Sequence, residues 1–171
     1  MEIFIVEINC AEKIKPETLK QFQKKEITDE EKWKSHCLSY LLVDKFLDEV
    51  YGIKSREIVF EEGKPILIDG GKHFSISHSK DLIALAFSDS NCGVDIEKVE
   101  LREFKKIADR MKFEAETLGE FYEEWTKYEA MYKLGKNIDY GSIACFDLED
   151  YTLTAVSEDP CEEFEIYFQN N

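Results

Sequence analysis

Hydrophobic and polar positions alternate with two different periods along the chain, and each period predicts one kind of element. Apolar runs with a period near two, bounded by turn residues, predict strands. These strands lie at 3–8, 57–60, 66–68, 73–77, 82–87, 92–97, 142–148, 151–156 and 164–168. Apolar residues at helical spacing predict helices over 28–52, 102–110 and 114–134. Thr28 and Glu31 form a capping-box pattern at the start of the first helix.

The order of these elements predicts an α+β protein. A strand, a helix and strands are followed by a strand, helices and strands, which is compatible with two α+β halves that meet near residues 88–92. The three strands between 73 and 97 are joined by short links rich in turn residues. We therefore expect these three strands to be antiparallel neighbours.

One charged residue interrupts the apolar stripe of the helix over 114–134. Five apolar side chains fall on one helical face: Leu118, Phe121, Tyr122, Trp125 and Tyr132. Glu129 lies near the middle of that face, and Lys133 follows one turn later at its border. A carboxylate that faces a core without a partner is costly, so we expect Glu129 to hold a cation or a proton.

Two more carboxylates lie on an apolar strand. Asp95 and Glu97 are two residues apart, so they share one face of the strand. With Glu129 and Lys133 they indicate a divalent metal site that handles phosphate, because hard oxygen ligands suit Mg²⁺ or Mn²⁺. In the alternative, structural interpretation, the strand carboxylates are solvated and Glu129 pairs with Lys133 or Arg110.

Four short motifs carry a family resemblance. They are GKP at 63–65, FSISHS at 74–79, GVDIE at 93–97, and WTKYEA at 125–130 followed by Lys133. In this order and spacing, the set resembles the signature of 4'-phosphopantetheinyl transferases. The spacing and length are similar to the surfactin-synthetase-activating type, in which one chain holds two related halves.

The resemblance implies an architecture and an activity. The fold would be two similar α+β halves related by a pseudo-twofold axis, with the active site in the cleft between them. Residues 1–90 would form the half that contacts the nucleotide part of CoA, and residues 91–171 the half with the metal ligands and the catalytic helix. The enzyme would transfer 4'-phosphopantetheine from CoA to a serine of an apo carrier protein.

The same resemblance implies roles for the acidic cluster. Asp95, Glu97 and Glu129 would hold Mg²⁺, or alternatively Mn²⁺, and Asp95 would also belong to the CoA site. Glu129 or a water at the metal would act as general base on the incoming serine. Lys133 would stabilise charge on the phosphate of CoA, as both a catalytic and a CoA-binding residue.

Four other residues are implied as contacts for CoA. Lys64 is a candidate contact for the 3'-phosphate, and Ser77 and His78 match residues that contact the nucleotide part. His36 lies in a basic region near the first long helix, where the family uses basic residues.

One position departs from the family pattern. Tyr128 stands where the family usually has a lysine immediately before the glutamate. Lys127 cannot simply substitute for it, because neighbouring residues on a helix point about 100° apart. The departure puts one phosphate contact in doubt.

The net charge and the cysteine content limit the kinds of partner and cellular compartment that we expect for the chain. A net charge of −15 with no offsetting basic run argues against nucleic acid and anionic membranes. The five scattered cysteines lack metal-finger or redox spacing and read as reduced thiols in a cytoplasm. We expect no signal peptide and no membrane span. We also expect a monomeric cytoplasmic enzyme that binds CoA and an apo carrier protein of the acyl, polyketide or peptidyl kind.

Two other functions stay open at the level of the sequence. A metal-dependent phosphoesterase could use the same three carboxylates with water as nucleophile. A CoA-binding protein that has lost transfer activity would be the non-enzymatic alternative, with Tyr128 as the mark of that loss.

Overall fold

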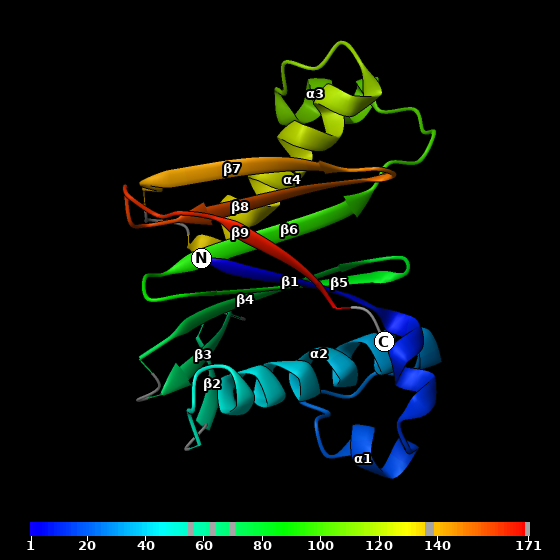
Figure 1. Cartoon of the computed structure of the whole chain (residues 1–171). Helices are drawn as coiled ribbons and strands as arrows, with labels where there is room; N and C mark the ends of the chain where they lie inside the picture. Colours follow the sequence, from blue (N-terminus) through cyan, green and yellow to red (C-terminus); the bar gives the residue numbers. More distant parts are fainter. Residues whose placement is uncertain (55–56, 62–63, 69–70, 136–138, 170–171) are drawn as a thin grey trace.

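The computed structural model describes residues 1–54, 57–61, 64–68, 71–135 and 139–169. Helices and strands follow one another in an α+β arrangement, as the sequence predicts (Figure 1). The elements are β1 (Glu2–Glu7), η1 (Ile8–Lys13), α1 (Pro16–Lys20), α2 (Glu30–Glu49), β2 (Glu57–Glu61), β3 (Lys64–Ile68), β4 (His73–Ser79), β5 (Leu82–Ser88), β6 (Cys92–Lys98), α3 (Lys105–Met111), α4 (Leu118–Leu134), β7 (Ser142–Leu148), β8 (Tyr151–Ser157) and β9 (Glu165–Gln169). Among the described helices, none combines the length and the apolar character needed to cross a membrane.

Helix starts are the boundaries that the sequence pattern located least well. The cap of α2 is Asp29, whose side chain accepts a hydrogen bond from the Lys32 backbone N–H, so the predicted capping role of Thr28 is wrong. Helix α4 begins four residues later than predicted, at a capping box formed by Thr117 and Glu120. The short helices η1 and α1 were not predicted, because neither is long enough to show a helical period.

The strands form three sheets with the orders β4-β5-β1-β9, β6-β8-β7 and β2-β3. The predicted antiparallel pair of β4 and β5 is present, but the predicted pairing of β5 with β6 is wrong. Strand β5 already has β4 on one edge and β1 on the other, so no edge is left for β6. Strand β6 instead begins the second sheet, where it pairs antiparallel with β8.

The hydrophobic core has two main layers, one on each face of the first sheet. Helix α2 covers one face, and the second sheet covers the other (Figure 1). The layer under α2 includes Phe4, Val6, Leu38, Phe46, Ile83, Leu85 and Phe87. The layer between the sheets includes Ile3, Ile5, Ala84, Ala86, Val94, Ile96, Leu153 and Ala155. The alternation of side chains along each strand therefore supplies both layers at once.

The last strand joins the first sheet. β9 pairs in parallel with β1, with Glu165 opposite Glu2. The described part of residues 91–171 thus contributes one strand to the sheet built by residues 1–90.

Helix α4 packs closely on the second sheet at Gly93 of β6. A Cβ atom at Gly93 would lie 2.0 Å from the Ala130 carbonyl oxygen and 2.9 Å from the Leu134 nitrogen. Only a glycine lets the helix backbone come this near. The contact orients the helix, and with it Glu129 and Lys133.

The buried face of α4 differs from the predicted stripe. It consists of Phe121, Tyr122, Thr126, Ala130 and Leu134. The expected position of Glu129 in the middle of the stripe is therefore wrong, because this residue is only partly buried and lies beside the stripe. The side chain of Tyr132, counted as part of the stripe, is 55% exposed. Small side chains lie where helix α4 and strand β6 come closest. The buried stripe is therefore rotated around the helix axis relative to the stripe predicted from the large apolar residues.

Replacing Gly93 by alanine should destabilise the protein by about 1–3 kcal/mol or more, because the new methyl group would meet helix backbone that cannot move aside. Chemical denaturation measures this free energy of unfolding. Gly119 is the matched control, since nothing lies within 4 Å of a Cβ atom there. Gly119→Ala should stabilise α4 by roughly 0.5–1 kcal/mol. Equal stability of Gly93→Ala and the native chain would contradict the close contact.

Candidate active site

Serine side chains of β4 satisfy backbone groups of β6. The hydroxyl oxygen of Ser75 accepts a hydrogen bond from the Val94 N–H at 3.1 Å, and that of Ser79 accepts one from the Lys98 N–H at 3.1 Å. The later residue of β4 contacts the later residue of β6, so the two strands run in the same direction. The two edge strands are thus joined by side chains where no backbone ladder forms.

The same row of serines holds the two strand carboxylates. The Ser77 hydroxyl donates to Asp95 Oδ1 at 2.7 Å, and the Ser79 hydroxyl donates to Glu97 Oε2 at 2.7 Å. The predicted shared face of Asp95 and Glu97 is confirmed by this pairing. Side chains two residues apart on β4 thereby orient side chains two residues apart on β6.

Asp95 is the most buried charge of the site, with 4% of its surface exposed. Lys133 Nζ lies 2.7 Å from Asp95 Oδ1 and 3.1 Å from the Val94 carbonyl oxygen. The second carboxylate oxygen, Oδ2, is buried without a hydrogen-bond partner in the described part of the chain. An unpaired buried carboxylate oxygen is costly, so this atom is a strong candidate ligand for a cation.

The other two carboxylates feel the charge of Asp95. Burial raises the pKa of the Glu129 carboxyl, the charge of Asp95 raises it further, and Lys133 opposes the shift. Burial also raises the pKa of Glu97, and Asp95 adds to this, while the hydrogen bond from Ser79 opposes it. Asp95 therefore repels both of the other carboxylates, as expected for groups that gather around a cation.

The residues present fit a divalent cation. Asp95 offers a buried oxygen without a partner, and Glu97 and Glu129 supply further hard oxygen atoms nearby. In the described ranges, no three His, Cys, Asp or Glu side chains are arranged closely enough to hold a metal ion by themselves. Mg²⁺ usually takes only one or two carboxylates and completes its coordination with water and substrate phosphates, which suits this arrangement. The predicted metal ligands stay predictions.

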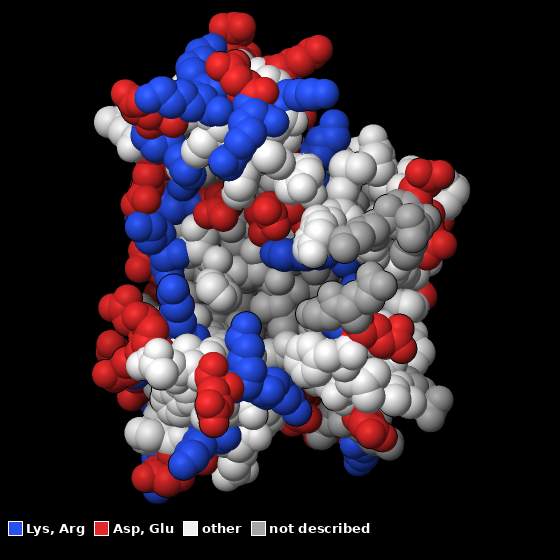
Figure 2. All heavy atoms as spheres, turned by 180° about the vertical axis from the view of Figure 1, so that it is seen from behind, with Lys and Arg blue, Asp and Glu red and all other residues white. Residues whose placement is uncertain are grey.

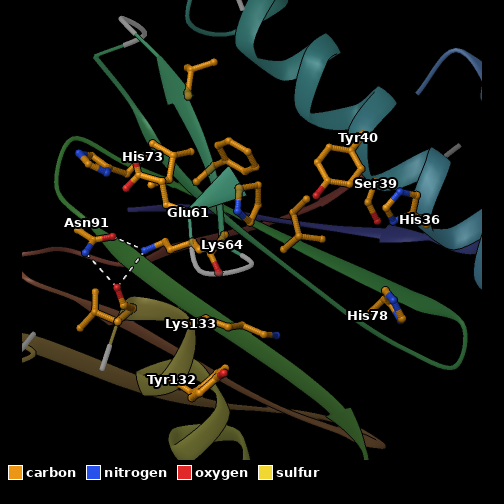
Figure 3. A pocket seen from close by; sticks show the side chains of 18 of the residues that line it. His36, Ser39, Tyr40, Glu61, Lys64, His73, His78, Asn91, Tyr132 and Lys133 are labelled. Atoms are coloured by element: carbon orange, nitrogen blue, oxygen red, sulfur yellow. Dashed lines mark hydrogen bonds between the residues drawn. The ribbon is translucent and has the colours of Figure 1, made fainter. Parts of the chain in front are cut away.

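A cavity of about 810 Å³ opens next to Lys133. Figure 3 shows His36, Ser39 and Tyr40 on the α2 side, with Tyr132 and Lys133 on the end of α4 opposite them. The lining also includes Lys25, Lys64, Pro65, Leu67, His73, Ser75, Ile76, His78, Asn91 and Glu158. A space-filling view from behind shows a recess with acidic and basic atoms on its walls (Figure 2). The mixture of apolar, imidazole and ammonium groups suits a ligand with both apolar and anionic parts.

Three histidines line the cavity, and two of them, His36 of α2 and His78 of β4, belong to the predicted site. Burial lowers the pKa of both imidazoles; Lys25 and His78 add to the shift at His36, and Lys133 adds to it at His78. Neutral imidazoles can still donate one hydrogen bond each to an anion. His36 Nε2 accepts from the Lys24 N–H at 3.2 Å, which leaves its other nitrogen as the donor.

The predicted site residues fall into two groups. His36, His78, Lys64 and Lys133 line the cavity together. Ser77 is not among the described lining residues; it is 6% exposed and its hydroxyl points to Asp95. The GKP motif is described in part, because residue 63 lies outside the described residues.

The carboxylates adjoin the cavity through Lys133, which both lines it and pairs with Asp95. In the described chain Lys133 pairs with Asp95 and not with Glu129, so the intrahelical ion pair of the structural alternative is wrong.

Sequence reasoning missed several cavity residues, among them Lys25, Tyr40, His73, Asn91 and Tyr132. Their surroundings explain the omission. The sequence predicts Asn91 as a turn residue and Tyr40 as a core residue of a helix, and each residue also has that structural role.

The residue that departs from the family pattern lies on the surface of α4. Tyr128 is 44% exposed, and its ring lies 6.0 Å from that of Phe113. Lys127, its neighbour, lies 4.0 Å from Glu124 on the same helix. Tyr128 therefore packs against the segment that precedes α4 and not in the core.

Comparisons with known proteins agree with the motif resemblance. No protein-family model matches the chain. The chain is 34% identical over 116 residues to the 4'-phosphopantetheinyl transferase gsp of Aneurinibacillus migulanus, covering 59% of this chain and 48% of that protein. It is 31% identical over 121 residues to the 4'-phosphopantetheinyl transferase psf-1 of Bacillus pumilus, covering 61% of this chain and 51% of that protein. The chain thus spans about half the length of the curated relatives it matches. The predicted resemblance to the 4'-phosphopantetheinyl transferase superfamily is confirmed.

Glu129→Gln should raise the melting temperature at pH 7 in the presence of EDTA, because it removes a partly buried charge that Asp95 also repels. The folded-state pKa of Glu129 lies above the ordinary value of 4.5. The charged carboxylate therefore weakens the fold above that folded-state pKa, and the penalty vanishes below pH 4.5, where both states are protonated.

The gain in melting temperature should accordingly disappear as the pH falls to about 4. Glu123→Gln, on the exposed side of α4, is the control and should change little at either pH. A gain of equal size at both pH values would contradict the repulsion.

Proposed function

We propose that this protein transfers 4'-phosphopantetheine from CoA to a serine hydroxyl of an apo carrier protein, with a divalent cation such as Mg²⁺. The observation that carries the proposal is the Asp95–Lys133 pair at the edge of the cavity, with an unpaired Asp95 oxygen beside it. Both relatives are named as 4'-phosphopantetheinyl transferases, which supports the same activity. Because the chain spans about half of those relatives, its activity, substrates and partners rest on this proposal.

The proposed site lies in a cleft between two α+β halves, residues 1–90 and 91–171, related by a pseudo-twofold axis. Two features support this arrangement: each half has one long helix packed on its sheet, α2 on the first and α4 on the second. The cavity lies between these helices (Figure 3). Strand β9 belongs to the second half by sequence, but it pairs with β1 in the sheet of the first half.

The reaction is a displacement at phosphorus. The serine oxygen of the carrier protein bonds to the β-phosphorus of CoA, and the bond from that phosphorus to the bridging oxygen breaks. Adenosine 3',5'-bisphosphate leaves with the bridging oxygen and its electron pair. When bound, the cation neutralises charge on the pyrophosphate.

Two residues of α4 would act directly. Glu129, with its raised pKa, is suited to take the proton of the serine hydroxyl. Lys133 would place its ammonium on a phosphate oxygen as charge develops there. Lys133 pairs with Asp95 and also lines the cavity, so its ammonium is within reach of the Asp95 carboxylate and of a phosphate bound in the cavity.

The remaining residues would bind and orient. Asp95, Glu97 and Glu129 are the proposed cation ligands, and Ser77 and Ser79 fix the first two. His36 and His78, which lie on the same side of the cavity (Figure 3), would donate hydrogen bonds to the nucleotide part of CoA.

The test is incubation with CoA, Mg²⁺ and a panel of apo carrier proteins, read by intact mass. A gain of one phosphopantetheine on a carrier supports transfer. Breakdown of CoA without modification of any carrier would indicate a phosphoesterase instead, and binding without turnover would indicate a CoA-binding protein.

Glu129→Gln should lower the transfer rate by roughly 10²–10⁴-fold, because the amide can neither accept the serine proton nor hold a cation with full charge. Glu123→Gln, a turn and a half earlier on the exposed side of the same helix, should leave the rate unchanged. Circular dichroism confirms that both variants are folded. Native turnover by folded Glu129→Gln would remove Glu129 from the mechanism.

Tyr128→Lys should raise kcat for transfer, because it restores an ammonium at the position where the family pattern has one. The side chain is partly exposed, so the change should alter the free energy of unfolding by only about 0.5 kcal/mol. Tyr128→Gln separates the added charge from the lost ring and should not raise kcat. Unchanged kinetics in folded Tyr128→Lys would show that this position does not reach the phosphate.

A further inference from the structure

Lys64 bonds to three protein acceptors at the wall of the cavity. Its ammonium donates to the Leu134 carbonyl oxygen at 3.0 Å, to the Cys92 carbonyl oxygen at 3.3 Å and to Asn91 Oδ1. Figure 3 shows the side chain reaching from β3 toward Asn91 and the end of α4. An ammonium has three N–H donors, so these contacts use all of them. A phosphate could be bound only by giving one of them up.

The acceptor at the end of α4 explains why a cation is placed there. The last carbonyls of a helix have no partner within the helix, and their partial negative charge favours a cation. Leu134 is the last residue of α4, and its carbonyl also accepts from Asn91 Nδ2 at 3.0 Å. Lys64 and Asn91 thus share one acceptor and bond to each other, which makes a closed triangle.

The lysine links helix α4 to the β2–β3 pair, whose Leu67 packs in the core layer under α2. Strands β2 and β3 form a two-stranded sheet of their own, and Lys64 is the first residue of β3. Its neighbours Pro65, Ile66 and Leu67 line the cavity. Burial lowers the pKa of Lys64, as expected for an ammonium packed into this wall.

Two lysines also meet the same edge of β6. Cys92 O accepts from Lys64 and Val94 O accepts from Lys133, and these carbonyls are two residues apart and therefore point to the same side. Lys133 immediately precedes Leu134, whose carbonyl Lys64 holds. A shift of the last turn of α4 would move Lys133 relative to Asp95.

We propose that Lys64 is a positioning residue that fixes the last turn of α4, and through it Lys133, and that it does not read the 3'-phosphate of CoA. The kinetic part of this inference rests on the proposed transfer function. The structural part does not, because it concerns contacts within the protein.

The experiment compares Lys64→Met with Lys72→Met. Lys72 is a matched control, since it is also partly buried but pairs with Asp89 at 2.7 Å and lies over the Tyr51 ring, and neither partner belongs to α4. Hydrogen–deuterium exchange of the Gly135 N–H, which bonds to Met131 O, reports on the last turn of α4. We expect this exchange to be about tenfold faster in Lys64→Met and unchanged in Lys72→Met.

Kinetics with CoA and dephospho-CoA separates the two roles of Lys64. Loss of positioning should lower kcat while the ratio of the two KM values stays that of the native enzyme. Normal exchange together with lost preference for CoA would overturn the proposal. If the native chain shows no transfer, calorimetric binding of CoA and dephospho-CoA replaces the kinetics, so failure of the proposed function is distinguished from failure of this inference.

Asn91→Ala is the second variant if Lys64→Met does not fold. It removes one donor to the Leu134 carbonyl and one acceptor of Lys64, so it should also speed exchange at Gly135. Where both single variants fold, their effects on this exchange should be less than additive in the double variant, because both residues serve one contact. Full additivity, or unchanged exchange in Asn91→Ala, would overturn the triangle as the element that holds the helix end.

Discussion

The open edge of β6 is the constraint on which the rest of the site depends. A strand edge exposes backbone N–H and C=O groups that need partners when they are buried. On β6 these groups do not pair with another strand; side chains from three elements satisfy them. Serines of β4 accept from the N–H groups of Val94 and Lys98, and Lys64 and Lys133 donate to the carbonyls of Cys92 and Val94. The seam between the two sheets and the side chains of the candidate site are therefore one hydrogen-bonded system.

This arrangement explains why charged groups can stand close together inside the protein. Asp95 is buried, but it has a hydroxyl and an ammonium as partners for one oxygen. The other two carboxylates stay nearer the surface, with pKa values raised by burial and by Asp95. Burial and repulsion of charged groups lower the stability of the fold, and such costs are common at functional sites.

The sequence predicted the elements well and their partners less well. Strand positions followed from the period of two, which depends only on neighbouring residues. The pairing of β6 with β8 could not be predicted, because it depends on β1 having already taken the second edge of β5. Within the candidate site, the shared face of Asp95 and Glu97 followed from their spacing alone. The place of Glu129 was missed because Thr126 and Ala130, which do not look like core residues, form the buried face of α4.

Lys64 shows the limit of motif reasoning in another way. A lysine in a turn motif reads as a solvent-exposed contact for an anion, and nothing near it in sequence indicates otherwise. Its actual acceptors lie 27, 28 and 70 residues away. Only the tertiary fold brings these groups together.

The parallel pairing of β9 with β1 has a consequence for how the protein is made. Because Glu2 lies opposite Glu165, β1 leaves the ribosome long before its second neighbour β9 does. Contacts between such distant residues form slowly, and β1 keeps an apolar, unpaired edge in the meantime. The nascent chain is therefore exposed to aggregation at this edge until β9 has been made and has paired with β1.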